Sequence, residues 1–176
     1  MSQDALYQDT LDSGEDAVDV IVEQWRRERP DLDSSAKEVT GRIVRLASLF
    51  QQAYAGTFEP LGLNEGDYGV LAPLRRAGAP HELTPTELAK HRMMTSGGMT
   101  AALDRLERKG LVLRVPNPDD RRGSLVRLTD AGRDVIDEAM TQHVLTEKRL
   151  VSGLDEDERD QLRDLLRKVL STIHVE

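Results

Sequence analysis

Apolar side chains recur every three or four residues in three stretches of the N-terminal half, and this spacing predicts three amphipathic helices. The first covers residues 16–29 and ends before Pro30, because proline disfavours helical backbone in the residue before it. The second covers residues 35–58. The third follows Asn64, a suitable N-cap, and ends at the turn "RRAGAP". The apolar positions that define these faces are Val18, Ile21, Val22, Trp25, Val39, Ile43, Leu46, Ala47, Phe50, Tyr54, Tyr68, Leu71, Ala72 and Leu74.

Two shorter helices are predicted within "LTPTELAKHRMMTSGGMTAALDRLERKGLV". Thr84 and Glu87 have the spacing of a capping box at the start of the first, with proline in the first helical position. Thr95 or Ser96 can cap the second, which ends at Gly110. The apolar face of the second helix consists of Met99, Leu103 and Leu106.

A hairpin and two further helices are predicted after this pair. The β-prone runs "LVLRV" and "SLVRL" flank a turn rich in Pro, Asn, Asp and Gly, which is typical of a hairpin. Thr129 caps a helix that begins with "DAGRDVIDEAM", and a last helix follows "SGLDEDE". The last helix carries an apolar stripe that is too hydrophobic to leave in water, made of Leu162, Leu165, Leu166, Val169, Leu170 and Ile173.

Two short helices followed by a two-stranded hairpin have the order of a winged helix-turn-helix. The expected fold class is therefore mainly α with a small β-hairpin wing, together with a helical dimerisation region. Four segments are predicted: a mobile acidic tail over 1–15, N-terminal helices over 16–58, the winged region over 59–128 and C-terminal dimerisation helices over 129–176.

Charge is distributed unevenly along the chain. The 176 residues carry a net charge of -8, which argues against a surface that coats nucleic acid or anionic membrane everywhere. Residues 84–127 hold nine basic and five acidic side chains, a local charge of +4 that leaves -12 for the rest. A local basic region in an acidic protein is what a DNA-binding module needs.

Several classes of protein are disfavoured by what the sequence lacks. It has no cysteine, which removes thiolate metal sites, cysteine nucleophiles and thiol redox sensing. It has no Ser-centred nucleophile motif and no phosphate-binding Gly-rich loop, so an enzyme is not expected. The four histidines have no ligand spacing, so neither a metal nor another cofactor is expected. Without a signal peptide or a long apolar run, the expected location is cytoplasmic, with no membrane partner.

Residues 60–140 resemble the core of a MarR-family transcription regulator. The motifs that carry the resemblance are "LTPTELA", "LDRLERKGLV" and above all "NPDDRRGSLVRLTDAG", which is similar to the wing signature of that family. The resemblance implies a winged helix-turn-helix that binds double-stranded DNA, with the flanking helices serving dimerisation.

The predicted wing carries Asp120, Arg121 and Arg122 at its tip. A hairpin tip is slender enough to reach the DNA minor groove, whose narrow, negative channel attracts arginine. We expect Arg122 to enter the groove and Arg121 to contact a phosphate. The family's Asp-x-Arg pattern implies that Asp120 holds the Arg122 guanidinium. The alternative is a solvated turn whose charges only keep the protein soluble.

The second short helix is the expected recognition helix. Thr95, Ser96 and Thr100 are placed to contact phosphates or bases, and Gly97 would let the helix N-terminus approach the DNA backbone closely. Tight packing of the glycine-containing turn is an equal alternative for Gly97. Arg105 is a further candidate DNA contact, or else an ion-pair partner of its neighbours Asp104 and Glu107.

The first predicted helix resembles the extra N-terminal helix of the urate- and aromatic-acid-responsive branch of the family, in which a Trp, an Asp and two Arg line the ligand site. Trp25 matches the Trp and Arg114 matches one Arg, whereas Gly69 and Ala102 stand at the positions matched to the other two. The resemblance implies a small anionic aromatic ligand, bulkier and less charged than urate. The alternative is that Trp25 is an apolar packing residue and Arg114 a phosphate contact.

The function expected from these patterns is sequence-specific DNA binding by a ligand-responsive transcription regulator, in the form of a repressor. A homodimer would bind a pseudo-palindromic operator. The alternative is a winged-helix adaptor that contacts an acidic protein without binding DNA.

Overall fold

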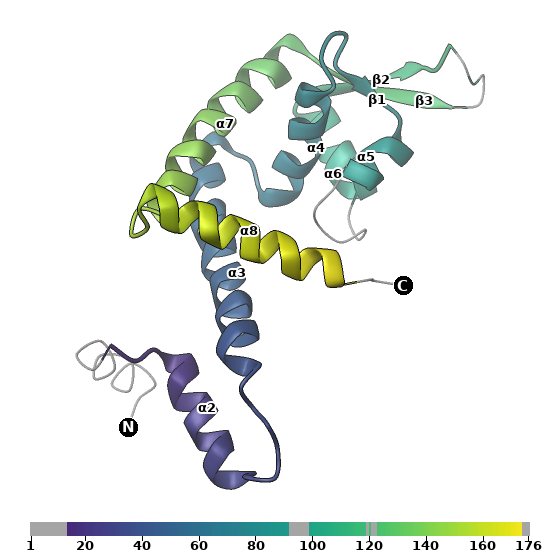
Figure 1. Cartoon of the computed structure of the whole chain (residues 1–176). Helices are drawn as coiled ribbons and strands as arrows, with labels where there is room; N and C mark the ends of the chain where they lie inside the picture. Colours follow the sequence, from purple (N-terminus) through teal and green to yellow (C-terminus); the bar gives the residue numbers. More distant parts are fainter. Residues whose placement is uncertain (1–13, 92–98, 119, 121–122, 174–176) are drawn as a thin grey trace. The chain divides into compact units, whose positions relative to one another are not determined.

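The computed structural model describes residues 14–91, 99–118, 120 and 123–173 (Figure 1). Contacts divide the chain into two units, residues 1–52 and 53–176, so that helix α3 (Lys37–Phe58) contributes residues to both. This division does not test the four predicted segments, which stay predictions. Within the described residues, no helix is both long enough and apolar enough to cross a membrane.

The first unit pairs α2 (Ala17–Glu28) with the N-terminal part of α3. Asp16 caps α2 by accepting a hydrogen bond from the backbone N–H of Val18 at 2.7 Å. Arg42 of α3 donates to Asp16 Oδ2 at 2.8 Å and to Asp19 Oδ1 at 2.7 Å. The hydrogen bond from Arg42 is the main reason why the pKa of Asp19 lies below its ordinary value. The carboxylates that start α2 therefore also bind it to α3.

The predicted apolar face of α2 is only partly buried in this unit. Val18 and Val22 are buried, whereas Ile21 and Trp25 remain nearly half exposed, at 47% and 45%. Lys37 places its Nζ atom 5.9 Å from the centroid of the Trp25 ring.

The second unit contains the end of α3, the remaining helices and a small sheet (Figure 1). Its elements are η1 (Glu59–Leu61), α4 (Glu65–Arg76), β1 (Glu82–Leu83), α5 (Pro85–His91), α6 (Met99–Arg108), β2 (Val112–Pro116), β3 (Ser124–Leu128), α7 (Asp130–Leu150) and α8 (Glu156–Thr172). The core is built from residues of the C-terminal end of α3, α4, α5, α6, the sheet and α7. Its largest fully buried apolar side chains are Phe58, Leu71, Leu74, Leu88, Leu106, Ile136, Val70 and Val126.

The sheet confirms the predicted hairpin and extends it. Strands β2 and β3 pair antiparallel, with Arg114 opposite Val126, and β1 pairs with the other edge of β3, which gives the order β1-β3-β2. The two-residue β1 was not predicted, because a strand of that length has no periodic pattern to detect.

Three of the predicted helix caps are confirmed, whereas the cap predicted at Thr95 or Ser96 lies outside the described residues. Asn64 Oδ1 accepts from the Asp67 backbone N–H at 2.9 Å. Thr84 and Glu87 form the expected reciprocal pair, with backbone N–H to side-chain oxygen distances of 2.8 and 3.1 Å. Thr129 Oγ1 accepts from the Gly132 N–H at 2.9 Å and so begins α7. Local side-chain chemistry thus defines where these helices start.

Candidate nucleic-acid interface

Helix α6, the predicted recognition helix, buries one face and exposes another. Ala102, Leu103 and Leu106 are buried in the core, and the chain leaves the helix through Gly110, whose φ of 70° favours glycine. Thr100 and Arg108 lie on exposed positions of the same helix. The exposed face can therefore meet a partner without disturbing the core.

A buried carboxylate on α4 holds α6 in place. The Asp67 side chain is only 1% exposed, and its Oδ1 accepts hydrogen bonds from Arg105 Nε at 2.9 Å and Arg105 Nη2 at 2.7 Å. Lys109 Nζ lies 3.3 Å from Oδ2 and also donates to the Gly62 carbonyl at 2.6 Å. Because an unpaired buried carboxylate is costly, this arrangement ties the C-terminal half of α6 to α4.

The wing is tied to α6 by a second set of charges. Arg114 of β2 donates through Nη1 to Glu107 and through Nη2 to Asp104, both at 2.6 Å. The hydrogen bond to Asp104 raises the pKa of Arg114 above its ordinary value, so the guanidinium remains charged. At the edge of β3 opposite β2, Arg127 of β3 pairs with Glu82 of β1. The hairpin and α6 therefore form one connected surface.

The structure describes some of the predicted DNA contacts and not others. Thr100 is exposed on α6, and Asp120 is exposed beyond β2. Arg105 contacts Asp67 and, at 3.4 Å, Asn64, instead of the predicted neighbours Asp104 and Glu107. The predicted contacts Thr95, Ser96, Gly97, Arg121 and Arg122 lie outside the described residues. All of these DNA contacts stay predictions.

Part of the local positive charge counted from the sequence is neutralised within the fold. Arg105 and Lys109 share Asp67, and Arg127 pairs with Glu82, two carboxylates that precede residue 84. Among the described cations of residues 84–127, Lys90 and Arg108 have no carboxylate partner. The cationic surface left for DNA in this part of the chain is therefore smaller than the sequence count indicates.

Sequence reasoning missed Asp67, the residue on which the position of α6 depends. A signal was present, since Asp67 stands three residues after Asn64 and completes a capping box. That spacing accounts for a carboxylate at the start of α4 but does not reveal its partners on α6 and directly after it, 38 and 42 residues away in the sequence. Within the described residues, no group of three or more His, Cys, Asp or Glu side chains could hold a metal ion.

Comparisons with known proteins agree with this geometry. Residues 61–123 match the sequence model of the MarR family. The chain is 38% identical over 152 residues to the HTH-type transcriptional regulator PecS of Dickeya dadantii (strain 3937), which covers 86% of this chain and 92% of that protein.

Two similar solved structures contain DNA. Sco3205, a MarR family transcriptional regulator from Streptomyces coelicolor in complex with DNA, matches with a TM-score of 0.71 and 26% identity, over 82% of this chain and 91% of that chain. A mutant MarR from E. coli complexed with operator DNA matches with a TM-score of 0.67 and 32% identity, over 79% of this chain and 99% of that one.

Proposed function

The chain belongs to the MarR family, and on that basis we propose that it is a homodimeric, ligand-responsive repressor. It is a DNA-binding transcription regulator and not an enzyme. The observation that supports the proposal best is that Asp67 and Arg114 hold α6 and the wing in one surface while Thr100 and Arg108 stay exposed. The winged-helix adaptor is the less favoured alternative, because two similar structures contain DNA.

Helix α8 supports the homodimer. All six apolar side chains of its predicted stripe are exposed in the single chain, from 38% for Leu162, Leu166 and Val169 to 71% for Leu170. A contiguous apolar surface of this kind is typical of a protein interface. A two-fold dimer would place two recognition helices about 34–36 Å apart, which suits half-sites separated by one turn of DNA.

Replacing Leu166 with glutamate is expected to weaken the dimer at least tenfold, because a charge would be buried in an apolar interface. Sedimentation over a range of micromolar concentrations measures the shift toward monomer. Ser171→Glu is the control, since it adds the same carboxylate to α8 outside the stripe and should leave the dimer intact. A wild-type protein that sediments as a monomer at these concentrations would overturn the proposal.

Replacing Arg122 with alanine is expected to weaken binding to DNA from the upstream region of its own gene and to lower the salt slope of the binding constant by about one unit. The reason is the loss of a groove or phosphate contact at the wing. Arg29→Ala removes the same charge from the first unit, where Arg29 pairs with Asp31, and should change neither quantity. Equal affinity and salt slope in wild type and Arg122→Ala would show that the wing is only a solvated turn.

The proposed effector is a small anionic aromatic molecule, with Trp25 and Arg114 as its predicted binding residues. The exposed Trp25 ring and its neighbour Lys37 suit an anionic aromatic group. Arg114 already holds Asp104 and Glu107, so an anion that binds its guanidinium competes with these carboxylates, and displacing them would release β2 from α6. A tenfold loss of DNA affinity requires a coupling free energy of only about 1.4 kcal/mol.

The Asp and the second Arg of the family's ligand site were matched to Gly69 and Ala102, which lack those side chains. An aspartate and an arginine are nevertheless present nearby in the sequence. Asp67 lies two residues before Gly69 on α4, and Arg105 lies three residues after Ala102 on α6; the two form an ion pair at 2.7 Å. Because these two charges are directed at each other and Asp67 is buried, a ligand less charged than urate stays the prediction.

A further inference from the structure

Met140 of α7 is an exposed methionine in a protein that has no cysteine. It is 44% exposed, whereas Met99, the other methionine that the structure describes, is packed against the core. With no thiol to compete, an accessible thioether is the side-chain group that hydrogen peroxide oxidises most readily. The sulfur of Met140 is therefore the most reactive one among the described residues.

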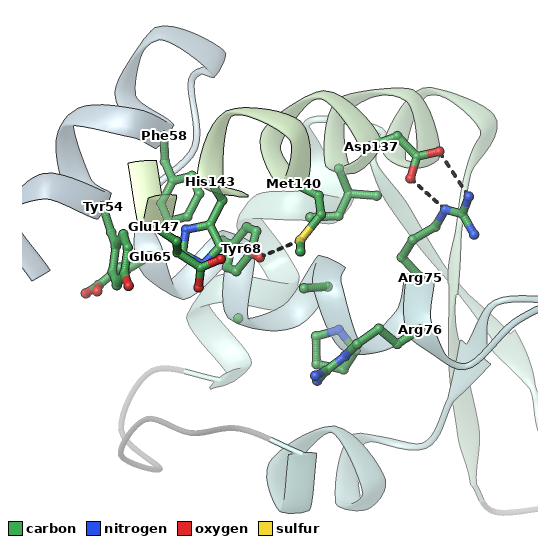
Figure 2. Close-up of a pocket in the computed structure, with 14 residues that line it drawn as sticks. Tyr54, Phe58, Glu65, Tyr68, Arg75, Arg76, Asp137, Met140, His143 and Glu147 are labelled. Carbon is green, nitrogen blue, oxygen red and sulfur yellow. Dashed lines mark hydrogen bonds and ion pairs between the residues drawn. The ribbon is translucent and has the colours of Figure 1, made fainter. Parts of the chain in front are cut away.

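A fixed phenol of α4 donates a hydrogen bond to this sulfur (Figure 2). Tyr68 Oη lies 3.1 Å from Met140 Sδ. The Tyr68 ring stacks on that of Phe58, with centroids 4.4 Å apart and an angle of 18° between the ring planes. Burial raises the pKa of Tyr68, so its hydroxyl stays protonated and remains a donor. One side of the sulfur is thus held against α4.

The two lone pairs of the Met140 sulfur are not equivalent in the folded protein. One lone pair accepts the hydrogen bond from Tyr68, and no other hydrogen bond to this sulfur occurs among the described residues. Addition of oxygen to one lone pair or the other gives sulfoxides of opposite configuration. The bond from Tyr68 therefore distinguishes the two faces of the sulfur.

We propose that Met140 is a site of oxidation by hydrogen peroxide, at which Tyr68 directs the oxygen to one face of the sulfur. The free lone pair attacks one peroxide oxygen, and the S–O bond forms while the O–O bond breaks. The departing hydroxide takes the proton of the transferred oxygen and becomes water. The sulfur loses two electrons and the peroxide gains two. Tyr68 is a positioning residue, because none of its bonds changes.

Oxidation alters the contact between α4 and α7. A thioether is apolar and a weak acceptor, whereas the oxygen of a sulfoxide is polar and a strong one. The Met140 side chain therefore turns so that this oxygen accepts the hydrogen bond from Tyr68. The other side-chain link between the two helices in the described part of the chain, from Arg75 to Asp137, contains no sulfur and is unaffected (Figure 2).

Peptide mapping by mass spectrometry measures the oxidation after the full chain has been treated with hydrogen peroxide. The tryptic peptide 134–148 contains Met140 as its only methionine, so its sulfoxide is quantified directly. We expect Met140 to be oxidised about tenfold faster than Met99, because Met99 is packed against the core. No DNA is present, so the result does not depend on the proposed function.

The configuration at sulfur separates a directed site from a side chain that is only exposed. The two classes of methionine sulfoxide reductase each reduce one epimer, so the fraction of the peptide that each class reduces gives the epimer ratio. The wild type should give about a fivefold excess of one epimer, and Tyr68→Phe should give nearly equal amounts. Thr141→Val is the matched control. It removes the neighbouring hydroxyl of α7, which bonds to the Asp137 carbonyl at 2.9 Å, and should keep the excess.

Three results would each overturn the proposal: equal amounts of the two epimers in the wild type, an excess that persists in Tyr68→Phe, or oxidation of Met99 as fast as that of Met140. Protein that is oxidised after unfolding in urea gives the reference ratio, which should be close to one. The melting temperature of Tyr68→Phe shows whether its fold is intact. The rate comparison and the epimer ratio of the wild type test the site without any substitution.

Discussion

The Arg105→Ala protein is expected to lose about 3 kcal/mol of unfolding free energy. Arg105 provides two of the hydrogen bonds to the buried Asp67 carboxylate, and its removal leaves that charge with Lys109 at 3.3 Å as the remaining cation. Breaking a buried ion pair by removing one partner typically costs about 3–5 kcal/mol, and the remaining lysine places the expected value at the lower end. Urea denaturation at neutral pH measures the change.

Arg75→Ala is the matched control for this prediction. It removes an arginine that also makes two hydrogen bonds to one aspartate, but both Arg75 and Asp137 are 40% or more exposed. Ion pairs exposed to solvent contribute about 0–1 kcal/mol, so this variant should be nearly as stable as the wild type. If both variants lost the same unfolding free energy, the burial of Asp67 would not be the reason for the lower stability of Arg105→Ala.

A double-substitution cycle separates the two possible roles of Arg105. If Arg105 only positions α6 through Asp67, its replacement in an Asp67→Asn background should weaken DNA binding no further. If it also contacts DNA, as predicted from the sequence, the second substitution should weaken binding again and lower the salt slope by about one unit.

The Gly132→Ala protein is expected to lose about 4 kcal/mol of unfolding free energy, a large part of the stability of an ordinary domain. A Cβ atom on Gly132 would lie 1.9 Å from the Leu111 carbonyl oxygen and 2.9 Å from its carbon. The first turn of α7 cannot simply move away, because Thr129 donates its N–H to that oxygen at 3.1 Å and its hydroxyl to Gly110 at 2.7 Å. Overpacking of this kind costs about 1–3 kcal/mol, and the hydrogen bonds lost with it add to the cost.

Gly56→Ala is the corresponding control within α3. Among the described residues, no atom outside the adjoining helix backbone and the two chain neighbours lies within 4 Å of a Cβ atom at that position, and alanine favours helix over glycine by about 1 kcal/mol. Urea denaturation should show this variant to be as stable as the wild type or slightly more so. A Gly132→Ala protein as stable as the Gly56→Ala protein would contradict the close approach of α7 to Leu111.

The start points of helices were predictable because their determinants are local. The capping residues Asn64, Thr84 and Thr129 bond to backbone groups within three residues, so the information lies in a short stretch of sequence. The hairpin was predictable for the same reason, from two β-prone runs and the turn residues between them. The α8 stripe was recognisable from periodicity, and the exposure of all its members follows from the absence of a covering element in the described part of the single chain.

The sequence by itself determined that this protein is a winged helix-turn-helix regulator, because helical periodicity, caps and wing motif are all encoded between neighbouring residues. Only the tertiary structure decided which charges remain available to a partner. Arg105 and Arg127 were counted as cations of the DNA-binding region, yet the fold gives them to Asp67 and Glu82. It also brings Tyr54, Tyr68 and His143 together from three helices. These pairings join residues that are 38 to 89 positions apart in the sequence, from Asp67 with Arg105 to Tyr54 with His143. No local pattern specifies them, because their energy comes from burial and desolvation in the assembled core.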